Sequence, residues 1–101
     1  TGKAMRVTWS PLAIDRVAEI ASRIAEDNPG AAEKWIRKVF ARTGQLANFP
    51  ESGRYIAETP RKDVRELLLG NYRIVYRVDS RQVAILTVRN AKQLLPPEDL
   101  K

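Results

Sequence analysis

The chain has 101 residues, of which 44% are hydrophobic and 30% charged, a size that suits one compact domain with a single core. It contains no cysteine and no histidine, which excludes disulfide scaffolds, thiolate nucleophiles, His-based catalytic triads and the common zinc and non-haem iron sites. We therefore expect neither a cofactor nor a metal site. The 18 Lys and Arg exceed the 12 Asp and Glu, and a net charge of +6 favours an anionic partner such as nucleic acid or an acidic protein.

The sequence also gives expectations about boundaries and location. No apolar run approaches the roughly 20 residues that a membrane span needs, and no signal-peptide pattern is present, so we expect a soluble cytoplasmic protein that does not bind membranes. Residues 1–4, which precede Met5, have the composition of a vector-derived remnant. Residues 5–96 are expected to form the single domain, and residues 97–101 a tail.

The first half of the chain predicts a short strand and two helices. Arg6–Trp9 is rich in β-forming residues, and Ser10 followed by Pro11 is typical of a helix N-terminus. The first helix then has an apolar face at helical spacing, formed by Val17, Ile20, Ala21 and Ile24. Asn28 and Pro29 repeat the cap-and-proline pattern for a second helix, which should end before Pro50. Its apolar face is expected to comprise Ile36, Val39, Phe40 and Thr43.

The second half predicts a loop and then three strands. Residues 51–61 contain Ser, Gly and Pro and are expected to form a loop. Strands are expected at 64–69, 72–78 and 83–89, joined by a tight turn at Gly70-Asn71 and a second turn at 79–82. The order of elements predicts an α+β fold, in which an N-terminal strand and an antiparallel two-helix hairpin precede a three-stranded antiparallel meander. The helices should pack on one face of the sheet and leave the other face open.

The positive charge is concentrated in the sheet half. Residues 54–92 contain nine Lys and Arg but only four Asp and Glu, a net charge of +5. Because side chains alternate along a strand, Tyr72, Ile74 and Tyr76 are expected to face the core, and Arg73 and Arg77 the open face. Arg65 and Arg89, on the neighbouring strands, are expected to converge with them on a site for phosphate or carboxylate. Glu66 is interpreted as an exposed strand residue without a partner.

Several segments resemble those of the RelE/ParE toxins of bacterial type II toxin-antitoxin systems. These are Pro-Glu-Ser-Gly-Arg at 50–54, Arg-Glu-Leu at 65–67, Gly-Asn-Tyr-Arg-Ile-Val-Tyr-Arg-Val at 70–78 and Ile-Leu-Thr-Val-Arg at 85–89. The resemblance runs from Met5 to about Pro96. It implies an α+β toxin that is neutralised by a cognate antitoxin, whose C-terminal helix and extended segment wrap around it. An acidic and apolar antitoxin segment would suit the basic sheet.

The resemblance leaves two activities open. RelE-like members cut mRNA in the ribosome, through attack of a ribose 2′-OH on the adjacent phosphate, and ParE-like members inhibit DNA gyrase. Arg73 matches the arginine that stabilises the phosphate in the nucleases, and Arg65 matches their basic residue on the preceding strand. Arg89 and Lys92 complete the candidate catalytic set, whereas Arg54 and Arg77 are candidates for binding the antitoxin or the target.

The end of the last strand departs from the nuclease pattern. No histidine occurs in the chain and no aromatic residue follows Tyr76, while asparagine and arginine are not bases near neutral pH. The favoured hypothesis is therefore a ParE-like gyrase inhibitor. A RelE-like ribosome-dependent endonuclease is the alternative. A third hypothesis is a non-toxic domain that binds the antitoxin or nucleic acid through its basic surface.

Overall fold

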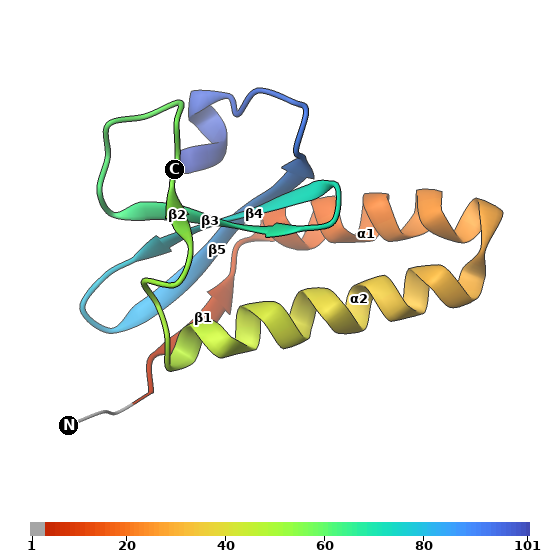
Figure 1. Ribbon diagram of the computed structural model, residues 1–101, viewed down its shortest axis with the longest axis horizontal. Helices are drawn as coiled ribbons and strands as arrows, with labels where there is room; N and C mark the ends of the chain where they lie inside the picture. The colour runs from red at the N-terminus through yellow and green to blue at the C-terminus, as the bar shows by residue number, and fades with distance from the viewer. Residues whose placement is uncertain (1–3) are drawn as a thin grey trace.

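The computed structural model describes residues 4–101, which form two helices and a five-stranded sheet (Figure 1). Three of the four residues predicted to be a vector-derived remnant lie outside the described residues. In chain order the elements are β1 (Arg6–Trp9), α1 (Pro11–Asp27), α2 (Pro29–Gly44), the 3₁₀ turn η1 (Gln45–Ala47), β2 (Arg54–Tyr55), β3 (Val64–Leu69), β4 (Tyr72–Val78), β5 (Gln82–Asn90) and the 3₁₀ turn η2 (Pro97–Leu100). No helix among the described residues has both the length and the apolar character that crossing a membrane requires.

The two helices begin where the cap-and-proline signals place them. The Ser10 hydroxyl accepts a hydrogen bond from the Ala13 N–H at 3.0 Å, and the Asn28 side-chain oxygen accepts one from the Ala31 N–H at 3.1 Å. Each cap satisfies a backbone donor that the first turn of a helix leaves without a partner. The Ser10 hydroxyl also donates to the Leu86 carbonyl at 2.8 Å, which fixes the start of α1 against β5.

The sheet has the strand order β1-β5-β4-β3-β2. The predicted meander of β3, β4 and β5 is present and antiparallel, and Gly70 in its tight turn has φ of 57°, a conformation that glycine adopts without steric cost. β1 pairs in parallel with β5, which places the N-terminal strand at one edge. β2 forms the other edge and lies inside the segment that was predicted to be entirely loop. A two-residue strand lacks the alternation that would predict it.

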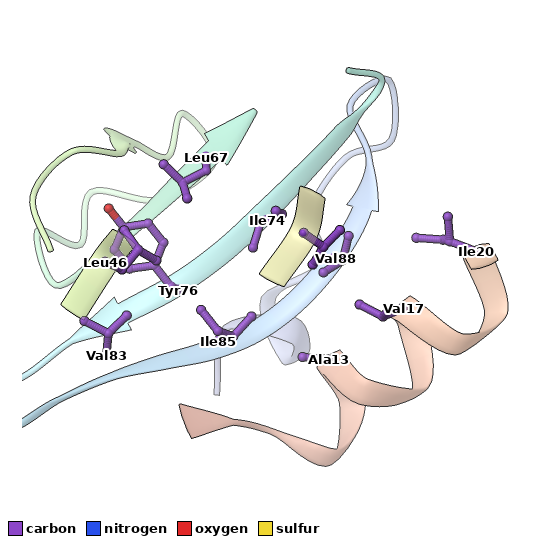
Figure 2. Close-up of a cluster of buried hydrophobic side chains, with 11 residues drawn as sticks. Ala13, Val17, Ile20, Leu46, Leu67, Ile74, Tyr76, Val83, Ile85 and Val88 are labelled. Carbon is purple, nitrogen blue, oxygen red and sulfur yellow. The ribbon is translucent and has the colours of Figure 1, made fainter. Parts of the chain in front are cut away.

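Both helices pack on one face of the sheet, as predicted (Figure 1). The main core contains Val17 and Ile20 of α1, Val39 of α2, and Ile74 and Tyr76 of β4, together with further buried side chains shown in Figure 2. The prediction that Ile74 and Tyr76 face the helices is therefore confirmed. Trp9 and Tyr72 are partly buried and pack against this core.

The prediction for Phe40 is only partly right. Phe40 is 51% exposed, although its ring packs against Trp9 with the ring centroids 5.2 Å apart. It therefore marks the margin of the apolar face of α2 rather than its centre.

The second face of the sheet is covered, so the expectation of an open face is wrong. A second apolar cluster joins Val64 and Val75 of the sheet to Ile56 in the loop before β3 and to Leu95 and Leu100 near the C-terminus, with Ala84 and Leu86 of β5 completing it. Residues 97–101 were predicted to be a tail, yet Asp99 and Leu100 are only 4% and 7% exposed. Figure 1 shows the C-terminal segment and the 56–63 loop on the side of the sheet away from the helices. The sequence prediction missed this cover because it lacks a regular hydrophobic period.

Candidate functional site

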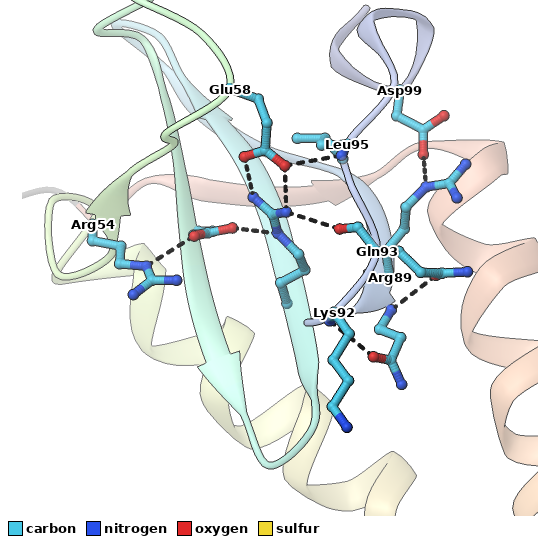
Figure 3. Close-up of polar contacts among 10 residues, drawn as sticks. Arg54, Glu58, Arg89, Lys92, Gln93, Leu95 and Asp99 are labelled. Carbon is cyan, nitrogen blue, oxygen red and sulfur yellow. Dashed lines mark hydrogen bonds and ion pairs between the residues drawn. The ribbon is translucent and has the colours of Figure 1, made fainter.

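Arg73 lies at the centre of a network of charged side chains on the second sheet face. Figure 3 shows this region, with Arg54, Glu58 and Gln93 among the labelled side chains. Its Nε donates to Glu66 Oε1 at 2.6 Å, and its Nη1 and Nη2 donate to the two carboxylate oxygens of Glu58 at 2.6 and 2.8 Å. Nη1 also donates to the Gln93 carbonyl at 3.2 Å. Four of the five guanidinium N–H groups therefore have partners, and the side chain is only 7% exposed. We call Arg73, Glu58 and Glu66 the clasp.

The hydrogen bonds of the clasp stabilise the charged forms of Glu58 and Arg73. The hydrogen bonds from Arg73 lower the pKa of Glu58 to about 2, and the Leu95 N–H, which donates to the same carboxylate at 2.9 Å, contributes to this shift. Glu58 and Glu66 in turn raise the pKa of Arg73. A carboxylate with so low a pKa is a poor general base near neutral pH. Because Glu58 lies in the loop before β3 and Leu95 in the C-terminal segment, the clasp ties both segments to β4.

The interpretation of Glu66 as an exposed residue without a partner is wrong. Its side chain is 2% exposed and its second oxygen accepts a hydrogen bond from Arg54 Nε at 2.8 Å. Register explains the error, because Glu66 lies directly opposite Val75 in β4 and opposite Arg54 in β2. Directly opposed residues share a face, so Glu66 lies on the same face as Arg73. Arg54 remains 64% exposed while it forms this ion pair.

Arg89 lies directly opposite Arg73 in the sheet and forms an ion pair with a different carboxylate, that of Asp99. Its Nε donates to Asp99 Oδ2 at 2.6 Å, and the Thr87 hydroxyl donates to the same oxygen at 3.1 Å. This bond raises the pKa of Arg89 and fastens η2 to β5. Lys92 is exposed and belongs to none of the ion pairs formed by residues 4–101.

Arg65 does not converge with the other arginines, contrary to the prediction. It lies directly opposite Tyr76, a residue of the helix-side core, and therefore points to the other face of the sheet. Its Nη1 donates to the carbonyls of Gly53 and Glu51 at 2.8 and 3.2 Å. Its guanidinium lies over the Tyr55 ring, 4.2 Å from the centroid, which is a cation–π geometry.

Arg77 lies on the second face, as predicted. It is paired with Val64 on one side and Ala84 on the other, and it is half-buried. It forms none of the ion pairs found within the described part of the chain. The structure therefore brings Arg54, Arg73, Arg77 and Arg89 to one face but supplies carboxylates to three of them.

Sequence reasoning missed both acidic partners of Arg73. The alternation of side chains along β3 could have placed Glu66 on the correct face. Leu67 and Leu69 pack on the helix side of the sheet, so Val64, Glu66 and Leu68 face the other side. No comparable signal exists for Glu58, which lies in an irregular loop 15 residues before its partner. In this structure the carboxylates of Glu58 and Glu66 occupy three of the five hydrogen-bond donors of the Arg73 guanidinium.

Comparisons with known proteins agree with the fold and the motifs. A family model described as "ParE toxin of type II toxin-antitoxin system, parDE" matches residues 7–95. The Sinorhizobium fredii protein named "Putative toxin Y4kP" is 39% identical over 93 residues, which cover 90% of this chain and 93% of the relative.

Two solved structures have a similar fold. One, from a chromosomal ParDE system of P. aeruginosa, has a TM-score of 0.73 at 18% identity and covers 88% of this chain and 98% of its own. The other, from the RelBE2 toxin-antitoxin complex of Mycobacterium tuberculosis, has a TM-score of 0.61 at 20% identity and covers 91% and 98%. Since the family model spans nearly the whole chain and a curated relative shares 39% of its residues, the chain belongs to the ParE toxin family of type II toxin-antitoxin systems.

Proposed function

We propose that this toxin inhibits DNA gyrase in the cytoplasm and is neutralised by a cognate antitoxin. The choice of gyrase over the ribosome as the target rests on one observation. The guanidinium of Arg73 is already bound to the carboxylates of Glu58 and Glu66. In a RelE-like nuclease, the matching arginine must face the scissile phosphate. Here it is 7% exposed and has four hydrogen bonds to the protein. The match to the ParE family model supports the same branch.

The energetic cost of freeing Arg73 argues against the nuclease alternative. The lowering of the Glu58 pKa from 4.5 to about 2 corresponds to about 3 kcal/mol of interaction, most of it with Arg73, that a phosphate would have to replace. A phosphate would have to displace Glu58 and leave that carboxylate without its main partner. The remaining nuclease candidates are dispersed, since Arg65 points to the opposite face and Arg89 is bound to Asp99. No group in this arrangement has the environment of a general base.

A cognate antitoxin suits the surface that the fold leaves accessible. The two solved structures of similar fold come from a ParDE toxin-antitoxin system and from the RelBE2 toxin-antitoxin complex. In this chain Ile14 of α1 and Phe40 of α2 are 55% and 51% exposed, so both helices offer apolar side chains that a partner can cover. Arg54 and Arg77 stay candidates for contacts with acidic groups of the antitoxin or of gyrase.

Two assays on the purified toxin distinguish the proposal from its alternatives. We expect the protein to inhibit gyrase supercoiling of a relaxed plasmid and to leave mRNA intact in a reconstituted translation reaction. Addition of the protein encoded beside it should restore supercoiling. Codon-phased cleavage of mRNA, lost in an Arg73→Gln variant whose circular dichroism matches the wild type, would replace the proposal with the nuclease. Absence of both activities would favour the non-toxic binding domain.

A further inference from the structure

A pocket with several arginines in its lining lies between α1 and the ends of β4 and β5. The pocket has a volume of about 230 Å³. Its position follows from the lengths of the strands: β1 ends at Trp9, opposite Ile85, so the last residues of β5 have β4 on one side and no strand on the other. The side chains of α1 border the hollow that remains.

The polar groups around this pocket are mostly hydrogen-bond donors. Arg16 and Arg23, two helical turns apart on α1, line one wall, and Arg89 and Asn90 of β5 line the other. Glu19 is the one acidic residue among the lining side chains. Three arginines and one glutamate therefore line a small volume, a composition that favours an anionic ligand.

Two of these arginines have unused donors. The Nε of Arg16 is buried and has no hydrogen-bond partner among the described residues, which is costly for a charged donor. Arg89 donates to Asp99 through Nε, whereas its two terminal nitrogens take part in none of the hydrogen bonds found in residues 4–101. A buried Nε is out of reach of a ligand, so the donors available to one are the terminal nitrogens of Arg16, Arg23 and Arg89.

We infer that this pocket binds a phosphate group, from either a free nucleotide or a nucleic-acid backbone. A phosphate offers three or four acceptor oxygens in different directions, which suits arginines that line the pocket from both α1 and β5. A carboxylate has two oxygens in one plane and can pair fully with only one guanidinium fork. The inference does not rest on the proposed inhibition of gyrase, because it concerns the isolated toxin.

Glu19 does not prevent phosphate binding. Its contact with Arg16 Nη1 is 3.3 Å long, and the Glu19 side chain is 56% exposed. Surface pairs of this kind on a helix contribute little to stability, so a ligand can displace the carboxylate into solvent at low cost. Arg89 differs in this respect, because its bond to Asp99 is short and leaves only the terminal nitrogens for a ligand.

The test measures phosphate binding to the intact protein by isothermal titration calorimetry, with ADP and a short single-stranded DNA as separate probes at equal ionic strength. We expect saturable binding of at least one probe. Loss of two charge-assisted hydrogen bonds in an Arg16→Gln/Arg23→Gln variant should weaken it by about a hundredfold or more. An Arg37→Gln variant is the matched control, because it removes one positive charge from an exposed position on α2. Its binding should remain unchanged.

The two probes distinguish a free nucleotide from a nucleic-acid backbone as the source of the phosphate, and three outcomes would refute the inference. Binding of ADP identifies a free nucleotide as a sufficient ligand, whereas binding of DNA alone identifies the backbone phosphate. Saturable binding of neither probe would overturn the inference. Equal weakening in Arg37→Gln would also overturn it, because it would reveal a general charge effect, and so would equally tight binding of citrate. If the double variant unfolds, the single variant Arg23→Gln, at an exposed position, serves the same comparison.

Discussion

Replacement of Glu58 by Gln tests whether the clasp holds the second sheet face together. Glutamine keeps the size and one carbonyl oxygen of the side chain but removes its charge, so Arg73 loses one of its two carboxylates. The guanidinium is only 7% exposed and cannot recover this interaction from water. The variant should therefore be less stable than the wild type at neutral pH.

The magnitude follows from the pKa of Glu58. A pKa lowered from 4.5 to about 2 corresponds to about 3 kcal/mol of interaction with the charged form, at roughly 1.4 kcal/mol for each pKa unit. The side chain is 20% exposed, so partial screening by solvent reduces the expected loss in Glu58→Gln to about 2–3 kcal/mol. Because the pKa is depressed in the folded state, this stability is fully present above pH 4.5 and is lost as the pH falls through 2.

Urea unfolding monitored by circular dichroism measures this difference at pH 7 and at intervals down to pH 2. The free energies of unfolding of wild type and Glu58→Gln should differ most at pH 7 and converge as the pH approaches 2. A Glu33→Gln variant is the control, because Glu33 is 70% exposed and pairs with Arg37 on the same helix, and its loss should be below about 0.5 kcal/mol. The reasoning is refuted if Glu58→Gln is as stable as Glu33→Gln, or if its deficit does not shrink with acidification.

Two further substitutions test the packing of this region. In Gly53→Ala the new Cβ would lie 2.5 Å from the Tyr76 hydroxyl, so we expect a loss of about 1–3 kcal/mol, whereas Gly44→Ala, with no atom within 4 Å, should be neutral or slightly stabilising. Equal urea midpoints for the two variants would contradict the close approach. Leu100→Ala should lower the unfolding free energy by about 2–3 kcal/mol because Leu100 is 7% exposed, whereas Leu94→Ala, at an 83% exposed position, should change it little. A negligible effect of Leu100→Ala would mean that the C-terminus is a tail after all.

The fold was predictable where local patterns determine the structure. Ser10 and Asn28 mark the helix starts because a capping side chain and a following proline act within one turn. Gly70 marks the hairpin because a tight turn requires its positive φ. The apolar alternation of β4 assigns its core-facing side because the strand period is two.

The site was less predictable because it depends on contacts between distant segments. Arg65 was assigned to the wrong face, and the actual register places it opposite Tyr76. Glu58 and Asp99 reach their arginines from irregular segments, and no periodicity predicts which acidic residue of a loop will meet a given strand. Composition described the charge of the sheet half correctly, but it contained no information about which charges are paired.

The pairing of charges divides the basic side chains of this region into two groups. Between residues 54 and 92, every ion pair involves one of Arg54, Arg61, Arg73 or Arg89, while Lys62, Arg65, Arg77, Arg81 and Lys92 form none with the described residues. The net charge of +5 in this region is therefore carried by side chains outside the clasp, whose own three residues have a net charge of −1. Loss of a charge from this second group should slow association with an acidic antitoxin segment and reduce its salt dependence, because exposed charges act mainly on the encounter rate. Loss of Arg73 should act through folding instead. A substitution at Arg73 that abolishes toxicity is thus evidence about the target only when the variant is shown to be folded.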